Sequence, residues 1–454
     1  MSYTDRIRDW LLTDDAALML GVMAGLYALF TVFGTVLGLN FAGIVSTLQQ
    51  ITFFAAVYAL LALALNLQWG YAGLLNIGVA GFMAVAVYTM AMLTAPVNAP
   101  AGGVPGLGLP IWVGILGGMT VAAVAGGVVA LPALRLKADY FAIVTLAFAE
   151  IIRITYNSQL FQTFSVAGFE MGTGASRGIP APTNPVLSLY YTDPSNYSAG
   201  TTAFGSMVFG AFGAIGLDEA LVVDITYTLI LIGFLVLYYV LLSRIANSPF
   251  GRVLKAIRND ELVARSLGKN TRWFKIKTFM LGCALMGFAG ILWQGSQSLI
   301  TPTQFTPMLT FYIFIALIIG GAGSNTGSVI GGALFAGLLF QGPVFVSRIV
   351  ETVFSLGTAP NTFPDAVAGL AALRVEPLLA YTLSNLASLR FVIVGLVLIY
   401  LMLKQPTGIL GHRKEIAASI DITERVSREG SATPPQGEVN SPDSQPGDSG
   451  KDDR

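Results

Sequence analysis

The sequence predicts an all-α, polytopic membrane protein with about ten transmembrane segments, some of them broken or re-entrant. Hydrophobic residues make up 54% of the 454 residues and charged residues only 11%, whereas soluble domains carry about 25% charged residues. The mean hydropathy is +0.70. Apolar runs long enough to cross a bilayer, which takes about 20 residues, recur along the chain. These three observations exclude a soluble protein.

Ten apolar segments are candidates for membrane helices, and the first is too long for the core of a signal peptide. Acidic residues also crowd the region before it, where a signal peptide would be basic, so we expect this segment to stay as the first span. The candidates are residues 16–39, 41–65, 74–95, 111–131, 140–157, 221–243, 277–299, 307–321, 326–347 and 389–403.

Basic residues predict the orientation, because short cytoplasmic loops carry an excess of Lys and Arg. Nine of the 25 Lys and Arg lie in the loop 244–277, and Arg135 and Lys137 follow the fourth span. The segments 96–110 and 158–220 hold one basic residue between them, Arg177. We therefore expect a plasma-membrane protein with cytoplasmic N- and C-termini, a cytoplasmic loop 244–277 and a long external loop 158–220.

The domain organisation follows from a change in composition near residue 411. Residues 1–411 form the predicted membrane domain. Residues 412–454 are rich in Ser, Pro, Gly and acidic residues, and such a segment cannot bury enough apolar surface to fold. We expect it to be a disordered cytoplasmic tail.

The residue inventory argues against an enzyme and against a bound cofactor. Cys283 and His412 are single representatives of their kinds, so an internal disulfide is excluded and no Cys or His pair has metal-ligand spacing. No GxxxxGK[ST] phosphate loop occurs. The net charge of zero gives no indication of nucleic-acid binding. If nucleotide energy is used, another chain must supply it.

The segment 65–81 places polar residues and helix breakers at membrane depth. Its sequence, LNLQWGYAGLLNIGVAG, contains three amides and several glycines. Broken helices of this kind bring polar groups to the middle of transporters. The alternative is a kinked helix whose amides are satisfied by neighbouring segments. The predicted translocation residues here are Asn66, Gln68, Gly70, Gly73 and Asn76.

Two further segments place polar or flexible residues inside apolar surroundings. In RLKADYFAIVTLAFAEIIR (135–153), Glu150 and Arg153 are three residues apart and share a helix face. They form either an ion pair that holds the bundle together or, as the minority hypothesis, a direct substrate contact on the translocation path. The glycine-rich segment 320–332 predicts a re-entrant turn or a tight cytoplasmic hairpin, and lacks the Lys of a nucleotide loop.

The basic loop has the pattern of an amphipathic helix over residues 252–267, which ends at Gly268. Charged residues alternate there with the apolar residues Val253, Leu254, Ile257, Leu262 and Leu267. This pattern indicates a docking surface for a cytoplasmic partner. The alternative is a solvated loop that only sets the membrane orientation.

Together, four segments resemble the permease family of branched-chain amino-acid ABC importers, the LivM type. They are residues 65–82, 135–153, 251–270 (GRVLKAIRNDELVARSLGKN) and 320–334 (GGAGSNTGSVIGGAL). The resemblance implies that the cytoplasmic loop is the coupling helix that docks on an ATPase. Leu262 and Val263 depart from the Ala pair of the general signature. The implied coupling residues are Gly251, Arg252, Ile257, Arg258, Asp260, Glu261, Ala264, Arg265 and Gly268.

The resemblance also implies partners: a sister permease subunit, cytoplasmic ATP-binding subunits that use the ATP, an external solute-binding protein, and membrane lipid. Three other functions stay open on the sequence. The first is a permease for urea or short amides in the same family. The second is a secondary transporter that works alone, with Glu150 as its coupling residue. A membrane enzyme is the least supported, since no nucleophile–base or metal set is present.

Overall fold

The computed structural model describes residues 15–411, apart from residues 99–102, 134–137, 167, 195, 355–359, 361, 369–374, 385–391, 393–394, 401–402 and 406. The predicted tail 412–454 and the basic residues Arg135 and Lys137 therefore lie outside the described residues. So does much of the predicted last span, 389–403.

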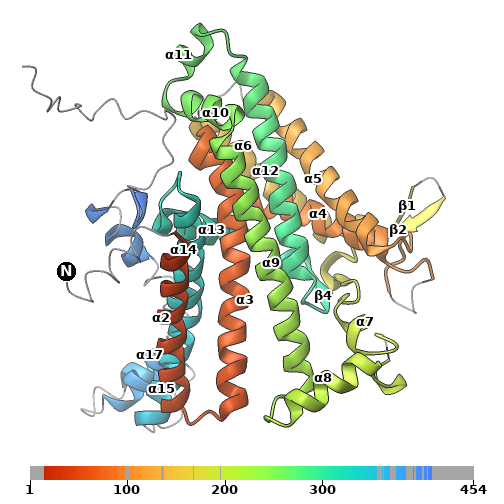
Figure 1. The fold of residues 1–454 in the computed structure, drawn as a ribbon, viewed down its shortest axis with the longest axis vertical. Coiled ribbons are helices and arrows are strands. Elements are labelled where there is room, and N and C mark those ends of the chain that lie inside the picture. The colour runs from red at the N-terminus through yellow and green to blue at the C-terminus, as the bar shows by residue number, and fades with distance from the viewer. Residues whose placement is uncertain are drawn as a thin grey trace, which may run out of the picture. The chain divides into compact units, whose positions relative to one another are not determined.

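The described chain is mainly helical, as predicted (Figure 1). The long helices follow the predicted spans, and two of them continue into π-helical turns, η1 and η6. The helices are α2 (Asp15–Val36), α3 (Phe41–Leu65), η1 (Asn66–Tyr71), α4 (Val79–Thr94), α5 (Ile111–Ala133), α6 (Ala138–Asn157), α9 (Glu219–Asn247), α10 (Pro249–Asn259), α11 (Glu261–Ser266), α12 (Thr271–Gln294), α13 (Pro307–Gly320), α14 (Asn325–Leu334), η6 (Phe335–Gln341), α15 (Gly342–Phe354), α16 (Phe363–Ala368) and α17 (Glu376–Ser384).

Seven helical segments of the described chain are long and apolar enough to cross a membrane, so the predicted count of ten is not confirmed. Helix α4 has only 16 residues, because the chain before it is not helical. Helix α6 has the length but carries Asp139, Glu150 and Arg153. The multi-pass architecture itself is confirmed.

Helix α3 forms the centre of the bundle (Figure 1). It packs against α2, α9, α12, α13 and α14, and 78% of the apolar window that it shares with η1 is buried, against 17% for α2. Its sequence is apolar on every side, which is typical of a helix surrounded by other helices. A second layer forms where α4 and α5 pack against α12.

Helices α13 and α14 form a tight hairpin. The turn between them uses Gly321 and Gly323, whose φ angles of +107° and +98° favour glycine. A Cβ atom on Gly331 would lie 2.0 Å from the carbonyl oxygen of Ala316, so the two backbones touch. The glycine-rich segment 320–332 therefore forms a tight turn between two helices, and the cytoplasmic location predicted for such a hairpin stays a prediction.

The segment 158–218 is largely irregular, as expected, with short helices α7 (Leu187–Tyr190) and α8 (Ala203–Gly213). It also contains strands that the sequence does not predict. Strand β1 (Phe164–Val166) pairs antiparallel with β2 (Phe169–Met171), and β3 (Ile179–Pro180) pairs antiparallel with β4 (Leu299–Ile300). Strands of two or three residues are too short to leave an alternating pattern. The one-turn helices are η2 (Gln159–Phe161), η3 (Ala175–Arg177), η4 (Tyr197–Ala199) and η5 (Pro302–Gln304).

Candidate functional site

The predicted coupling helix 252–267 is in fact two helices, α10 and α11, which meet at Asp260. They lie at the opposite end of the bundle from α7 and α8 (Figure 1). Asp260 has an extended backbone (φ −155°, ψ 108°) and caps α11, since its carboxylate accepts hydrogen bonds from the backbone N–H of Leu262 (2.8 Å) and Val263 (3.1 Å). An Asp in this role ends one helix and begins the next. The loop itself is shorter than 244–277, because α9 continues to Asn247.

Gly268 ends α11, as predicted. Its φ is +75°, its N–H donates to the carbonyl of Arg265 (3.0 Å), and the N–H of Lys269 donates to the carbonyl of Ala264 (3.2 Å). This pair of bonds is the Schellman motif, which requires a residue with positive φ. The buried Ala264 faces inward beneath this turn.

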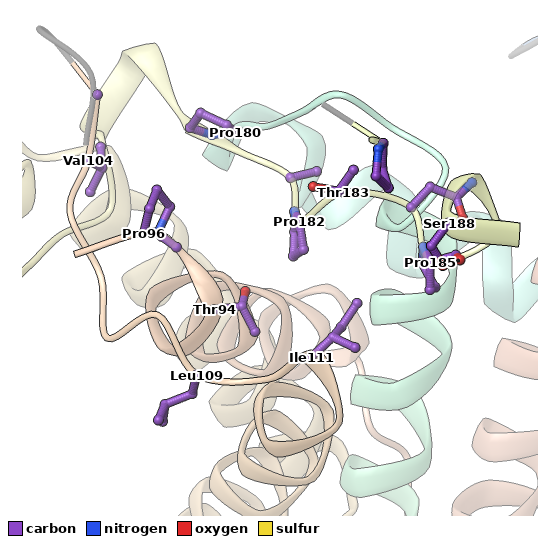
Figure 2. Close-up of a pocket in the computed structure, with 15 residues that line it drawn as sticks. Thr94, Pro96, Val104, Leu109, Ile111, Pro180, Pro182, Thr183, Pro185 and Ser188 are labelled. Atoms are coloured by element: carbon purple, nitrogen blue, oxygen red, sulfur yellow. Dashed lines mark hydrogen bonds between the residues drawn. The ribbon is translucent and has the colours of Figure 1, made fainter. Parts of the chain in front are cut away.

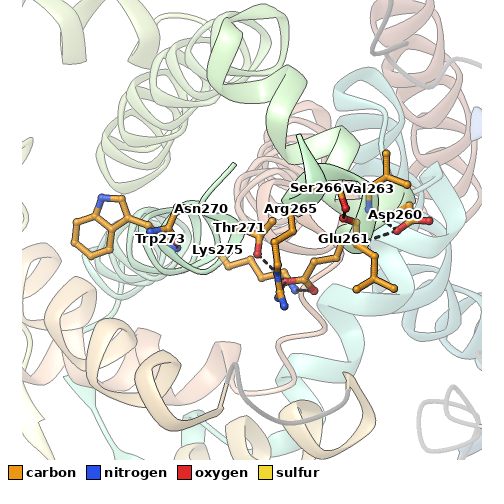
Figure 3. A network of polar contacts seen from close by, with 10 residues as sticks. Asp260, Glu261, Val263, Arg265, Ser266, Asn270, Thr271, Trp273 and Lys275 are labelled. Carbon is orange, nitrogen blue, oxygen red and sulfur yellow. Dashed lines mark hydrogen bonds and ion pairs between the residues drawn. The ribbon is translucent and has the colours of Figure 1, made fainter. Parts of the chain in front are cut away.

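Glu261 holds α11 against α12 (Figure 3). Its carboxylate pairs with Lys275 (2.5 Å) and with Arg265 (3.1 Å), and accepts a hydrogen bond from Thr271 (2.9 Å). Burial alone would raise the pKa of the Glu261 carboxyl, but the hydrogen bonds from Lys275 and Thr271 outweigh it and hold the pKa below its ordinary value of 4.5. Glu261 is therefore charged at neutral pH and positions α11.

Helix α10 connects the two predicted sites. Its inner face buries Gly251, Leu254 and Ile257, while the Arg258 guanidinium donates to the backbone carbonyl of Gly70. A Cβ atom on Gly73 would lie 3.3 Å from the Arg258 side chain. The predicted coupling segment therefore contacts the end of η1 and the chain directly after it. Arg252, by contrast, is exposed on the other face of α10.

Three large apolar side chains are exposed on α11 and at its C-terminal cap. Leu262, Val263 and Leu267 are 73%, 56% and 72% exposed, although charged residues surround them in the sequence. We name these three residues the α11 tip. In the sequence, Leu262 and Leu267 belong to the predicted apolar face, and Leu262 and Val263 depart from the family pattern.

The predicted helix break is present between η1 and α4. The chain from Gly73 to Gly78 is not helical, and a π-helical turn such as η1 is typical of functional sites. Neighbouring threonines satisfy the freed backbone groups: Thr145 of α6 accepts from the N–H of Ile77 (3.0 Å), and Thr310 of α13 accepts from the N–H of Ala80 (3.0 Å). Freed amides inside a membrane protein need such partners.

The three predicted amides are fully buried and bonded within the chain. Asn66 accepts from the N–H of Gly323 (2.7 Å) and donates to Asn325 (3.1 Å). Gln68 donates to the carbonyl of Phe279 (2.9 Å) and accepts from Asn76 (2.8 Å). These contacts fit the alternative in which neighbouring segments satisfy the amides. A role of the five residues in translocation stays a prediction.

Replacing Asn76 with Leu is expected to destabilise the break. Asn76 also accepts from the N–H of Gly78 (2.9 Å), so the change leaves that N–H and the Gln68 oxygen without partners, at about 1–3 kcal/mol each. Thermal unfolding measured with a thiol-reactive dye reports this, because the sole cysteine, Cys283, is buried. Thr89→Val is the control, since the Thr89 hydroxyl donates to the carbonyl of Val85 in its own helix. Equal unfolding temperatures for both variants would contradict the assignment.

Glu150 and Arg153 lie on α6 and pair with each other, at 2.9 Å and 2.5 Å. The Glu150 side chain is 35% exposed and the Arg153 side chain is 23% exposed. The ion pair that the sequence predicts is therefore present, but it lies within a single helix.

A pocket of about 590 Å³ opens at the end of α4 (Figure 2). It lies between the segment 94–111 and the segment 180–194, on the side of the bundle away from α10 and α11. No charged residue and none of the predicted site residues line it. Proline and aliphatic side chains form most of its lining.

Sequence reasoning missed the residues that complete these networks: Thr145, Thr310, Asn325 and Lys275. Single threonines in apolar runs carry little information, because most bond to their own helix. Asn325 was easier to identify from the sequence, because Ser324 and Asn325 are polar residues that directly follow the glycines of the turn.

Comparisons with known protein sequences identify relatives of this chain. The sequence model of the permease component of branched-chain amino acid transport systems matches residues 47–371. The chain is 32% identical to the high-affinity branched-chain amino acid transport system permease protein LivM of Salmonella typhimurium over 278 residues, 61% of this chain and 59% of that protein. The corresponding protein of Escherichia coli strain K12 is 32% identical over 269 residues, 59% of this chain and 57% of the relative.

A more distant relative is the probable branched-chain amino acid transport permease protein LivM of Methanocaldococcus jannaschii, 26% identical over 313 residues, 63% of this chain and 79% of the relative. No solved structure matches the chain. The chain covers less than two thirds of the length of the two bacterial relatives. The family match, however, extends over more than half of the chain and includes the helix break, the ion pair of α6, α10, α11 and the α13–α14 hairpin. The chain therefore belongs to the family of permease components of branched-chain amino acid transport systems.

Proposed function

We propose that this chain is one permease subunit of an ABC importer that carries branched-chain amino acids across the plasma membrane by alternating access. A sister permease subunit completes the pathway, two cytoplasmic subunits bind and use the ATP, and an external solute-binding protein delivers the substrate. The chain has no ATP site or cofactor of its own. Both termini and the α10–α11 loop face the cytoplasm.

The α11 tip is the observation that carries this proposal. Three large apolar side chains lie exposed, close together in the sequence, on a loop that also carries many charged residues, which is typical of a protein–protein contact. A membrane contact is disfavoured, because the charged Asp260, Glu261 and Arg265 lie on the same short helix and its cap. The excess of basic residues in this loop supports its cytoplasmic location, so the partner is an ATP-binding subunit.

The contacts of α10 and α11 explain how docking can bias the membrane helices. The Glu261–Lys275 pair joins α11 to α12, and the Arg258–Gly70 bond joins α10 to the helix break. A partner that binds the tip differently in its two nucleotide states therefore acts on both elements. Only such differential contacts can shift a conformational equilibrium.

Glutamate substitutions at Leu262 and Leu267 test the proposal. Burying a carboxylate in the contact with the ATP-binding subunit is unfavourable. The double variant Leu262→Glu/Leu267→Glu should therefore co-purify with at least about tenfold less ATP-binding subunit, which corresponds to a loss of roughly 1.4 kcal/mol in binding free energy. Uptake of radiolabelled leucine by the reconstituted importer should fall with it. The yield and thermal unfolding of the permease should not change, since both side chains are exposed.

Leu160→Glu is the matched control. Leu160 is 83% exposed but lies beyond the far end of α6, so this variant should keep its ATP-binding subunits. Normal co-purification and uptake in the Leu262/Leu267 variant would refute the docking role of the tip. Uptake of urea, but not leucine, by the wild-type importer would support the amide permease instead.

A further inference from the structure

The Glu150–Arg153 pair is an unusual arrangement for charges in a membrane protein. Each residue is the other's ion-pair partner within α6, three positions apart. Across the described residues, no hydrogen bond or ion pair links either side chain to a second helix. An ion pair that joins no second helix does not hold the bundle together. Its charges also raise the free-energy cost of inserting α6 into the membrane.

The pair lies close to the helix break between η1 and α4. Ala149 packs directly on Gly81, where a Cβ atom would lie 2.5 Å from the Ala149 Cα. The adjacent N–H of Ala80 bonds to Thr310 of α13. Glu150 therefore lies beside the first turn of α4, directly after the break.

The rest of the described chain covers the face of α6 that carries the pair only in part, since the Glu150 and Arg153 side chains are 35% and 23% exposed. Ile151 and Ile154, which flank the two charged residues, are 61% and 57% exposed. Charged side chains on a membrane helix face protein or water and not lipid. The exposed face therefore combines an anion, a cation and aliphatic surface within two turns of helix.

We propose that this face of α6 is a substrate contact, at which Glu150 and Arg153 bind the charged groups of a zwitterionic amino acid with an aliphatic side chain. The inference rests on the proposed function and assigns two contact residues within it. The Glu150 carboxylate binds the ammonium group, and the Arg153 guanidinium binds the carboxylate, for which its planar fork is suited. Ile151 and Ile154 contact the aliphatic side chain.

The pairing within α6 is the resting state of this site. While no substrate is present, Glu150 and Arg153 neutralise each other. When the substrate binds, their ion pair is replaced by two others, one between Glu150 and the substrate ammonium group and one between Arg153 and the substrate carboxylate. No net charge enters the membrane layer in either state, so the exchange keeps the electrostatic cost of the path low. The sister subunit closes the site from the opposite side.

Exchanging the two charged residues distinguishes a substrate contact from an ion pair with a purely structural role. Glu150→Gln and Arg153→Gln should each lower leucine uptake by the reconstituted importer by roughly tenfold or more, because charge-assisted hydrogen bonds are lost. The double variant Glu150→Arg/Arg153→Glu restores an ion pair but reverses the order of the charges along the path. It should unfold at the wild-type temperature and still fail to restore uptake.

Asp139→Asn is the matched control, since it also removes one carboxylate from α6 but lies exposed in its first turn. It should transport normally. Normal uptake by the single variants, or recovery in the exchanged variant, overturns the inference and leaves the proposed function intact. A wild-type importer that carries urea and not leucine overturns both.

Discussion

Replacing Gly331 with Leu is expected to prevent the α13–α14 hairpin from closing. The new Cβ would meet the Ala316 oxygen at 2.0 Å and the Gly320 nitrogen at 2.7 Å. Both atoms belong to the backbone of α13, so no rotamer change can relieve the contact. Overpacking of an interior typically costs about 1–3 kcal/mol and more where nothing can move. We expect a large fall in yield and in the unfolding temperature reported by Cys283.

Gly233→Leu is the matched control for this effect. Gly233 is also inside a long apolar helix, α9, but apart from its chain neighbours and the adjoining backbone of α9, no atom lies within 4 Å of the position that its Cβ would take. The same substitution there should leave yield and unfolding temperature close to those of the unchanged protein. If both variants were equally stable, α13 and α14 would not be in backbone contact.

The comparison of glycines shows what the sequence could and could not predict. GxxxG spacing occurs at Gly21/Gly25 and at Gly327/Gly331, and both permit close approach of helices. In the structure, Gly331 touches the backbone of α13, whereas Gly25 has open space around it. Spacing reports where close packing is possible, but only the position of the neighbouring helix decides whether it occurs.

The helix break could be predicted for a related reason, but its contacts could not. The amides and glycines of residues 65–81 are incompatible with an uninterrupted apolar helix, so a break follows from local chemistry. Their partners are distant in the sequence: Phe279 lies 211 residues from Gln68, and Asn325 lies 259 residues from Asn66. Such pairings depend on tertiary packing, which hydropathy does not encode.

The apolar pattern of the coupling loop predicts a single helix, because it runs through Asp260 without interruption. The side chain of Asp260 instead bonds to the N–H groups that follow it, and this local competition with the helix is typical of Asp. The predicted end at Gly268 is correct, since a positive φ there needs no information from other helices. Local backbone chemistry is predictable to the extent that each residue has one dominant preference.

Replacing Glu261 with Lys is expected to abolish ATP-driven uptake without unfolding the membrane domain. The change removes the pairs with Lys275 and Arg265 and places a third cation between them. Helix α11 then loses its attachment to α12, so movement of a docked subunit is no longer passed to the membrane helices. We expect leucine uptake by the reconstituted importer to fall by at least roughly tenfold, which corresponds to about 1.4 kcal/mol.

The double variant Glu261→Lys/Lys275→Glu distinguishes this positioning role from direct contact with the ATP-binding subunit. It restores opposite charges between α11 and α12 with the same two residue types. Because the attachment is what matters in our account, uptake should recover substantially, and ATP-binding subunits should remain bound in both variants through the intact α11 tip. A double variant as inactive as the single one would show instead that the Glu261 carboxylate itself, whose side chain is 33% exposed, contacts the partner directly.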